Sequence, residues 1–313
     1  MFRSARFAPA LLLLAPTTLN AAPPAAPFMV SGTGKAYPHI ADAVRAIGSG
    51  AGTITIAPGT YRQCAVQQAG AIAYRAEKPG SVIFDGAICE GKAALVLRGR
   101  SAHVEGIVFQ NLRVPDGNGA GIRLERGDLT VSDSLFRDSE EGILTGNDPA
   151  ATIRIDRSTF RHLGRCDRDL DCAHSIYIGH YGALIVTNSR FEAGTGGHYI
   201  KSRAARVDIR NTSFDDSAGR ATNYMIDLSN GAAGLIAGNV MVQGRDKENY
   251  SAFITIAPEG RQHDSSALVI RDNHAAFVPG LSRISSFVAN WTRDTPQIAG
   301  NRLAKGIRES DRR

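Results

Sequence analysis

Apolar residues recur along this chain in a fixed pair, in which one residue precedes the other by five positions. In the first four copies the second residue is phenylalanine, and the residues around each pair are largely β-branched or apolar. Such segments are typical of short β-strands. The pairs are Val131/Phe136, Ile155/Phe160, Val186/Phe191 and Ile209/Phe214, with weaker copies at Ile236/Met241 and Ile270/Ala275.

A second apolar column belongs to the strands that precede these pairs. Every copy places an isoleucine at the same position of the strand, and turns rich in Gly, Asn and Asp separate the strands. No helical pattern interrupts them from Val82 onward. The column therefore predicts strands that repeat in register. It consists of Ile122, Ile143, Ile176, Ile200, Ile226 and Ile254.

The interval between successive closing phenylalanines varies, although the strand pattern stays constant. Starting from Phe109, the intervals are 27, 24, 31 and 23 residues. A period of about 20 to 50 residues indicates a solenoid, in which stacked strands alternate with a loop that can change length. A β-sandwich would need hairpin turns at short, regular spacing, and the leucine spacing of leucine-rich repeats is absent. The sequence therefore predicts an all-β fold, a single-stranded right-handed parallel β-helix (a solenoid).

One short helix is expected before the repeat. Residues Pro38–Ile47 carry apolar side chains at helical spacing, and Gly48 ends the pattern. The next segment, Thr53–Ala57, alternates as a strand. A helix at this point would cover the open end of the solenoid, which otherwise promotes aggregation. We therefore expect a short N-terminal capping helix.

The ends of this 313-residue chain are expected to lie outside one elongated domain. Residues 1–22 have the features of a secretory signal peptide, with two arginines before an apolar run that is too short to span a bilayer. Residues 23–30 are expected to be a disordered leader, and 31–300 the β-helix domain. Within it, 278–299 should cap the C-terminal end, and 301–313 should be a frayed tail. The protein is therefore expected to be exported, periplasmic or extracellular, without a transmembrane segment.

Cysteine content and charge add two expectations. An even number of four cysteines in an exported chain favours disulfides, and their order predicts Cys64–Cys89 and Cys166–Cys172. A zinc site is the alternative, but the thiols form two distant clusters and no CxxC occurs. The formal net charge is +6, and removal of Arg3 and Arg6 with the expected signal peptide lowers it to +4, a mild excess that suits an anionic partner. Because the basic residues form no single run and are not interleaved with aromatic residues, no nucleic acid is expected.

Aligning the repeats on the isoleucine column brings polar residues together. Side chains alternate between the faces of a strand, so the residue after each inward isoleucine must point outward. Each such residue alone is most often solvated surface or part of a weak cross-strand ion pair. Their coincidence on adjacent coils predicts a localised site. The candidate residues are Arg123, Glu141, His174, Tyr177, His198, Lys201, Arg203, Tyr224 and Asp227.

This set of side chains suits proton abstraction next to a carboxylate. β-Elimination of a uronate needs a cation that neutralises the carboxylate, a base for the neighbouring C–H and an acid for the leaving oxygen. Arg203 suits the first role, because its planar fork matches a carboxylate. We expect Lys201 to be the base, with a pKa lowered by Arg203, and His198 or Tyr177 to be the acid.

The remaining candidates are expected to bind the substrate. Asp227 could orient the lysine, or could hold a calcium ion together with Glu141. The acidic residues lack the spacing of a dedicated calcium loop, so no cofactor is certain and calcium remains open. The expected substrate-binding residues are Arg123, Glu141, His174, Tyr224 and Asp227.

Several segments of the chain resemble a known superfamily. They are Tyr37–Val44 and Thr53–Arg62 near the N-terminus, and His174–Gly179, Gly197–Arg203 and Ile226–Gly231 within the coils. In these segments the chain is similar to the bacterial right-handed parallel β-helix repeat proteins of the pectate-lyase-like superfamily. The resemblance implies the fold and an active site, but no particular sugar. Motifs of polygalacturonases, pectin methylesterases and pectate lyases are missing; lyases of this fold that use a lysine base near an arginine, often with calcium, match best.

Three functions remain compatible with these observations. The first is an exported lyase, or a C5-epimerase that shares its first step, acting on an acidic polysaccharide as a monomer. The second is an inverting glycoside hydrolase, which needs two carboxyls about 6.5–9.5 Å apart. Asp227 and Glu141 would lie about 14 Å apart, so a loop acid such as Asp167, Asp169 or Asp171 would have to reach in. The third is a non-catalytic carbohydrate-binding or cell-envelope protein.

Overall fold

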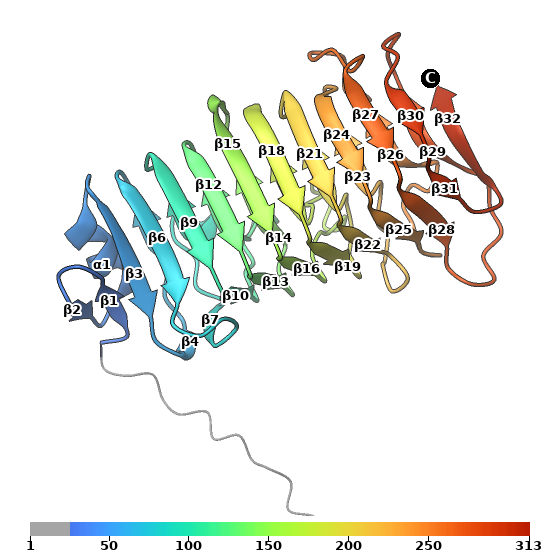
Figure 1. The fold of residues 1–313 in the computed structure, drawn as a ribbon. Helices are drawn as coiled ribbons and strands as arrows, with labels where there is room; N and C mark the ends of the chain where they lie inside the picture. The colour runs from blue at the N-terminus through green and yellow to red at the C-terminus, as the bar shows by residue number, and fades with distance from the viewer. Residues whose placement is uncertain (1–25) are drawn as a thin grey trace, which may run out of the picture.

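The structure, a computed structural model, describes residues 26–313, which form a right-handed parallel β-helix with three sheets along its length (Figure 1). The three sheets are called A, B and C. In sheet A all strands pair in parallel except at the N-terminal end, where β1 is antiparallel to both its neighbours. In spatial order sheet A contains β2 (Lys35–Tyr37), β1 (Phe28–Val30), β3 (Ala51–Ile56), β6 (Ala71–Ala76), β9 (Ser101–Glu105), β12 (Asp128–Ser132), β15 (Asp148–Asp156), β18 (Tyr181–Thr187), β21 (Arg206–Arg210), β24 (Ala233–Ala237), β27 (Leu268–Arg271) and β30 (Gln297–Ala299).

Sheets B and C each contribute one strand to nearly every coil. Sheet B contains β4 (Gly59–Tyr61), β7 (Val82–Asp85), β10 (Ile107–Gln110), β13 (Leu135–Arg137), β16 (Thr159–Arg161), β19 (Arg190–Glu192), β22 (Ser213–Asp215), β25 (Val240–Gln243), β28 (His274–Phe277) and β31 (Arg302–Leu303). Sheet C contains β5 (Ala65–Gln67), β8 (Ala93–Leu97), β11 (Ala120–Leu124), β14 (Glu141–Thr145), β17 (Ile176–Ile178), β20 (Ile200–Ser202), β23 (Ile226–Leu228), β26 (Ala252–Ile256), β29 (Ser285–Asn290) and β32 (Ile307–Arg312).

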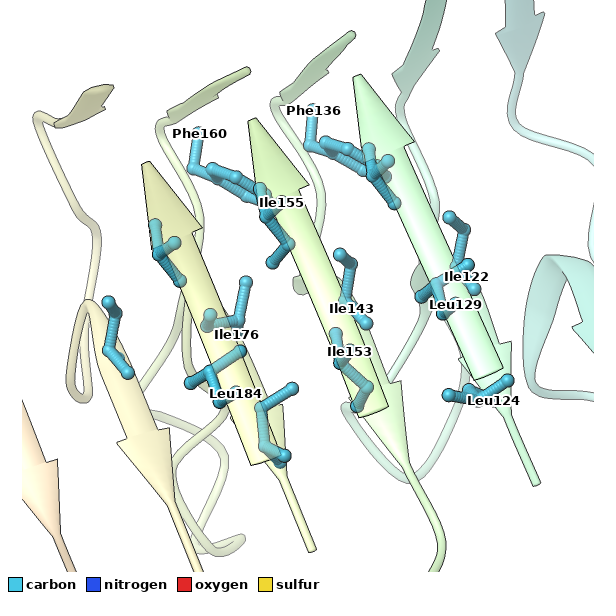
Figure 2. Close-up of a cluster of buried hydrophobic side chains, with 14 of the residues drawn as sticks. Ile122, Leu124, Leu129, Phe136, Ile143, Ile153, Ile155, Phe160, Ile176 and Leu184 are labelled. Atoms are coloured by element: carbon cyan, nitrogen blue, oxygen red, sulfur yellow. The ribbon is translucent and has the colours of Figure 1, made fainter. Parts of the chain in front are cut away.

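Inward side chains stack from coil to coil, as the two apolar columns predict (Figure 2). The isoleucines of sheet C pair directly, for example Ile176 with Ile200 and Ile200 with Ile226, and all three are fully buried. In sheet B the phenylalanine rings from Phe84 to Phe214 stack nearly parallel, with centroids 4.7–5.7 Å apart. Each aromatic pair adds about 0.5–1.5 kcal/mol beyond burial of its area, so the core fixes the register of the coils.

A polar ladder, which the sequence analysis did not find, runs along the turn between sheets A and B. In each of its seven coils the turn begins with a residue at positive φ and continues with the ladder side chain. The backbone N–H of each ladder residue donates to the side-chain oxygen of the next one, at 3.0–3.4 Å. Buried turn amides are thereby satisfied without water. The ladder consists of Ser134, Ser158, Ser189, Thr212, Asn239, Asn273 and Asn301.

Truncation of Asn239 in this ladder is expected to lower the free energy of unfolding by about 2–3 kcal/mol, because Asn239→Ala leaves buried polar groups unpaired. Its side chain accepts from the Thr212 N–H at 3.0 Å and donates to the Ile209 carbonyl at 2.9 Å. Urea denaturation measures the loss. The matched control is Gln262→Ala at an exposed position, where a change within about 0.5 kcal/mol is expected. Equal losses in both variants would contradict the role of the ladder.

The single α-helix of the described chain, α1 (Ile40–Ile47), covers the N-terminal end of the solenoid (Figure 1). Its apolar face, formed by Ile40, Ala43 and Val44, is buried. The helix contacts β1, β2, β3 and β5. The expected capping helix is therefore confirmed.

Both expected ends of the domain were wrong. Phe28 of the expected leader is fully buried, and its ring packs 5.0 Å from that of Tyr61, because β1 completes the first coil. Residues 1–22, the expected signal peptide, lie outside the described residues. At the other end, 278–299 supplies β29 and β30 instead of a cap, and 301–313 supplies β31 and β32 instead of a frayed tail. Apolar residues of this last coil continue the inward columns and pack on the core.

Both expected disulfides are confirmed. The S–S distances are 2.00 Å for Cys64–Cys89 and 2.08 Å for Cys166–Cys172. The second disulfide closes the loop that leads into His174. Two such bonds suit an oxidising compartment, in agreement with export. Within residues 26–313, no helix is long and apolar enough to cross a membrane.

Candidate active site

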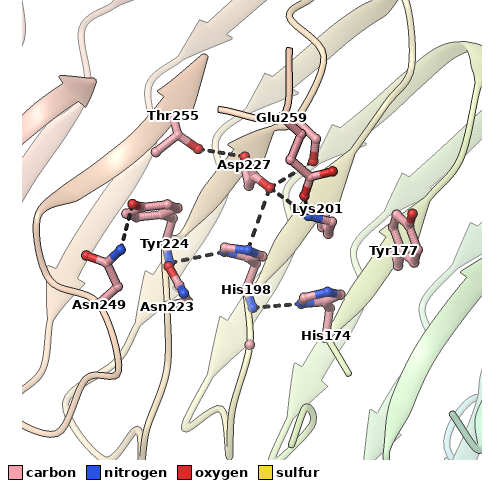
Figure 3. Close-up of polar contacts among 12 residues, drawn as sticks. His174, Tyr177, His198, Lys201, Asn223, Tyr224, Asp227, Asn249, Thr255 and Glu259 are labelled. Carbon is pink, nitrogen blue, oxygen red and sulfur yellow. Dashed lines mark hydrogen bonds and ion pairs between the residues drawn. The ribbon is translucent and has the colours of Figure 1, made fainter. Parts of the chain in front are cut away.

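The outward face of sheet C carries the predicted row of polar side chains (Figure 3). Tyr177 of β17 pairs with Lys201 of β20, which pairs with Asp227 of β23. Strand alternation places them opposite the buried isoleucines, as expected. They are less exposed than an open sheet face would leave them, since Lys201 is 8% exposed and Asp227 only 1%. The neighbouring loops therefore enclose the row, and electrostatic interactions within it are stronger than at an open surface.

A column of rings lies beside this row. His174, His198 and Tyr224 stack with centroid distances of 4.9 and 5.4 Å. The backbone N–H of His198 donates to Nδ1 of His174 at 3.0 Å, and that of Tyr224 donates to Nδ1 of His198 at 3.2 Å. Because each Nδ1 accepts a hydrogen bond, the proton of each neutral ring is on Nε2.

Both histidines are neutral at neutral pH. Burial, together with the nearby Lys201 and Lys247 ammonium groups, lowers the pKa of His198 to about 3. Burial and the neighbouring His198 likewise hold the pKa of His174 well below its usual value. His198 therefore cannot serve as an imidazolium acid, which corrects one of the two expected roles. Its Nε2 lies 3.6 Å from Oδ2 of Asp227, so it helps to position that carboxylate.

Asp227 is a fully engaged carboxylate. Its Oδ1 accepts from the hydroxyl of Thr255 at 2.7 Å, and its Oδ2 accepts from the hydroxyl of Ser229 at 2.8 Å. Oδ2 also accepts from Nζ of Lys201 at 3.2 Å. Because its acceptors are occupied and its side chain is buried, Asp227 is suited to hold the lysine in place, which is one of the roles expected for it. It is poorly placed to contact a sugar.

Lys201 is an ion-paired ammonium group in this structure. Burial lowers its pKa, but the charges and hydrogen bonds of Asp227 and Glu259 outweigh burial, and the pKa lies above its usual value. The expected depression by Arg203 is therefore wrong for this state. The reason is that two carboxylates contact the amine directly, whereas the guanidinium of Arg203 is occupied by other partners.

Arg203 extends across the same face with all three of its nitrogens engaged. Nε donates to the hydroxyl of Tyr177 at 2.9 Å, and Nη1 donates to Oδ1 of Asn230 at 2.8 Å. Nη2 pairs with Glu259. The guanidinium also lies 5.7 Å from the ring centroid of Tyr177. These contacts bring a fixed cation and a phenol together, next to the amine of Lys201.

Glu259 and Asn230 belong to the site, although neither was among the candidates. Glu259 lies in the loop after β26 and bridges Lys201 and Arg203 with its two oxygens. Its sequence neighbours Pro258 and Gly260 indicate a turn. This turn was the only sign in the sequence that the Glu259 side chain leaves the strand repeat and could reach another coil. Asn230 lies within a segment that carried the family resemblance, but no role was assigned to it.

Two expected substrate-binding residues lie away from this cluster. Glu141 of β14 is 1% exposed and accepts from the backbone N–H of His174 at 3.2 Å, so it cannot contact a substrate directly. Arg123 of β11 pairs with Glu125 at 3.2 Å, three coils from Lys201. The expected calcium pair of Asp227 and Glu141 is also wrong, because three coils separate the two carboxyls. Across residues 26–313 no group of three potential metal ligands converges.

The buried carboxyl of Glu141 leads to a pH prediction. Burial raises its pKa well above the usual value, so the folded protein binds this proton more tightly than the unfolded chain does. The resulting stabilisation is present below the unfolded pKa and is lost as the pH rises through the folded value. The unfolding temperature of the native sequence should therefore fall relative to that of Glu141→Gln as the pH rises above the usual pKa of a glutamate and through the raised folded value. Thermal unfolding of both proteins at a series of pH values measures this difference. A constant difference between their unfolding temperatures at every pH would contradict the prediction.

A buried ion pair supports the site from behind. Nζ of Lys247 lies 3.0 Å from Oδ2 of Asp216, and both side chains are fully buried. Asp216 also accepts from the hydroxyls of Tyr199 at 2.6 Å and Thr222 at 2.8 Å. Tyr199 in turn accepts from the backbone N–H of Gly194 at 3.1 Å. This network fixes the loop and strand that carry His198 and Lys201.

Comparison with known proteins gives a fold. No protein-family model and no curated protein sequence matches the chain. Among solved structures, the chain is similar to an alginate lyase from Paenibacillus sp. str. FPU-7, with a TM-score of 0.62 and 14% identity over 83% of this chain and 90% of that one. It is also similar to ORF18 of Geobacillus virus E2, with a TM-score of 0.55 and 13% identity over 87% and 56% of the two chains. The likeness shows that the chain has the fold of a right-handed parallel β-helix.

Proposed function

We propose that this protein is a polysaccharide lyase that cleaves a uronate-containing polysaccharide by β-elimination. The observation that carries the proposal is the convergence of Lys201, Arg203 and Tyr177 on one semi-buried face. Arg203 contacts the tyrosine hydroxyl at 2.9 Å, and Nζ of Lys201 lies 5.9 Å from the centroid of the same ring. A cation for the carboxylate and two proton-transfer groups thus lie within reach of a single sugar. The likeness in fold to an alginate lyase, whose substrate is an acidic polysaccharide, adds support.

In the proposed reaction Arg203 binds the uronate carboxylate and stabilises the negative charge that develops on it when the neighbouring C–H loses its proton. Lys201, in its neutral form, takes that proton. The electron pair of the broken C–H bond forms a carbon–carbon double bond, and the glycosidic C–O bond breaks. Tyr177 is favoured over His198 as the donor to the leaving oxygen, because the low pKa of His198 leaves it unable to supply a proton as an imidazolium.

Hydrolysis is the alternative with the least support. Asp227 is buried and already accepts three hydrogen bonds, which makes it a weak base for water. Among the loop acids considered from the sequence, Asp167 pairs with Arg165. Glu259 does reach the site, but it is held by two cations there. An epimerase would share the first proton abstraction and differ in the fate of the intermediate.

The test uses the purified protein with a panel of acidic polysaccharides, namely glucuronans, alginates, pectates and bacterial exopolysaccharides, with and without calcium. A rise in the ultraviolet absorbance of unsaturated uronates is the expected result. New reducing ends without that absorbance would establish a hydrolase instead. Binding with neither signal, and with no exchange of the uronate C–H in deuterated water, would establish a non-catalytic carbohydrate-binding protein.

The raised pKa of Lys201 predicts how turnover depends on pH. A base must be deprotonated to act, and the neighbouring carboxylates keep this amine protonated to higher pH than usual. The value of kcat/KM is therefore expected to rise from about pH 7 into the alkaline range, since the neutral fraction of Lys201 grows with pH. Initial rates in buffers of constant ionic strength measure the profile. A decline over the same range would assign Lys201 to the acid and contradict its role as base.

A further inference from the structure

The carboxylate of Glu259 occupies an unusual position between the two cations of the site. One of its oxygens pairs with Nζ of Lys201 and the other with Nη2 of Arg203. Its side chain is 40% exposed, whereas those of Lys201 and Arg203 are 10% and 20% exposed. The carboxylate therefore lies on the solvent side of both cations, in front of the part of the site that a polymer would reach first.

The other contacts of the two cations are made to groups of the scaffold. Nζ of Lys201 also donates to the buried Asp227, and Arg203 donates to Tyr177 and Asn230. Glu259 is thus the most exposed of the groups that contact both cations, and it contacts the two at once. A carboxylate bound there contacts the guanidinium of Arg203, the group that binds the uronate carboxylate in the proposed reaction.

The backbone that carries Glu259 is held in place, whereas its side chain is free to leave. The N–H of Ala257 donates to the Leu228 carbonyl at 2.8 Å, and that of Glu259 donates to the Ser229 carbonyl at 3.1 Å. Nδ2 of Asn230 donates to the Gly260 carbonyl at 3.0 Å. Within the described residues, the carboxylate of Glu259 has no hydrogen-bond partner besides Lys201 and Arg203. Release of the carboxylate therefore breaks these two contacts only and leaves the hydrogen bonds of the loop backbone in place.

We propose that Glu259 is a built-in competitor of the substrate carboxylate, which holds Arg203, the carboxylate-binding cation of the proposed reaction, together with the amine of Lys201 until a uronate displaces it. The inference rests on the proposed function and deepens it. Displacement exchanges one carboxylate for another on Arg203 and removes that of Glu259 from Lys201. A neutral or esterified sugar offers no such exchange, because it would leave both cations less well paired than Glu259 does. The competitor therefore selects for ligands with a free carboxylate.

The test measures binding separately from turnover. Unlinked monosaccharides, namely sodium D-glucuronate, D-mannuronate and D-galacturonate, lack the glycosidic bond whose cleavage is proposed, and they serve as probes in an NMR titration. The apparent affinity of a site equals its intrinsic affinity multiplied by the fraction of molecules in which the site is open. Because Glu259→Gln removes the competing charge, this variant is expected to bind the preferred uronate about tenfold more tightly than the native protein. Glu309→Gln, which removes an equal charge at an exposed position, should leave the affinity unchanged. D-Glucose and D-mannose should not bind to any variant.

The outcomes separate this inference from the proposed function. An unchanged or weaker affinity in Glu259→Gln, or no uronate binding in any variant, overturns the competitor, whether or not the native protein has lyase activity. Tighter uronate binding in a protein that cleaves no polysaccharide of the panel supports the competitor and counts against the lyase. Glu259→Ala, which cannot hydrogen-bond to either cation, repeats the test, and thermal melting checks that both variants fold.

Discussion

Replacement of Lys201 by alanine is expected to reduce kcat on the acidic polysaccharide by about 10²–10⁴-fold, the usual contribution of a general acid or base. No other amine in the described chain is placed to assume its role, since Lys247, the other buried lysine, pairs with Asp216 behind the site. The change should affect kcat more than KM, because Arg203 remains to bind the substrate carboxylate. Initial rates from the ultraviolet absorbance of the unsaturated product measure both parameters.

Two controls make this result specific. Lys305→Ala removes the same charge at an exposed position and should leave turnover unchanged. The Lys201→Ala variant should fold, because Asp227 keeps its hydrogen bonds from Thr255 and Ser229. Full activity in Lys201→Ala, together with loss of activity in Asp227→Asn, would favour a hydrolase and contradict the proposed mechanism.

Substitution of Lys247 by methionine is expected to lower the free energy of unfolding by about 3–5 kcal/mol, the range found when one partner of a buried ion pair is removed. Asp216 would then stay fully buried without its ammonium partner, with hydrogen bonds only from Tyr199, Thr222 and the backbone N–H of Gly244. Thermal and urea-induced unfolding measure the loss. Because the network fixes the strand that carries the site, the variant should also lose activity at a lower temperature than the native protein.

The matched control for this substitution is an exposed ion pair. Lys92 pairs with Glu125 at 3.0 Å, and its side chain is 41% exposed. Lys92→Met should change stability by less than about 1 kcal/mol, as is usual for surface pairs. Similar losses for Lys92→Met and Lys247→Met would show that burial does not set the energy of the inner pair.

Periodicity explains why so much of the fold could be predicted. In-register stacking turns a linear pattern into lateral neighbours, so aligning Ile176, Ile200 and Ile226 was sufficient to place the outward residues beside one another. The stacked histidines followed from the same alignment. Disulfide partners followed from chain order, because each pair lies within or between adjacent coils.

The features that were missed depend on quantities that a strand alignment does not contain. Glu259 reaches the site from a loop, and the path of a loop is not determined by the strand repeat. The protonation states of Lys201 and His198 depend on burial and on that loop carboxylate, so charge alone led to the wrong direction for the lysine. At the C-terminus, the short β31 and the charged β32 show little apolar alternation, although both complete the last coil.

The ladder and the phenylalanine column also bear on how such a chain can evolve. Most coils contribute their own aromatic ring, inward isoleucine and ladder oxygen. After gain or loss of an entire coil, the new neighbours would therefore make the same kinds of contact as before. The proposed site draws on three successive coils and the loop of a fourth, from His174 to Glu259. Duplication or deletion of coils outside that span could therefore lengthen or shorten the polymer-facing surface across generations while the reacting groups are inherited intact.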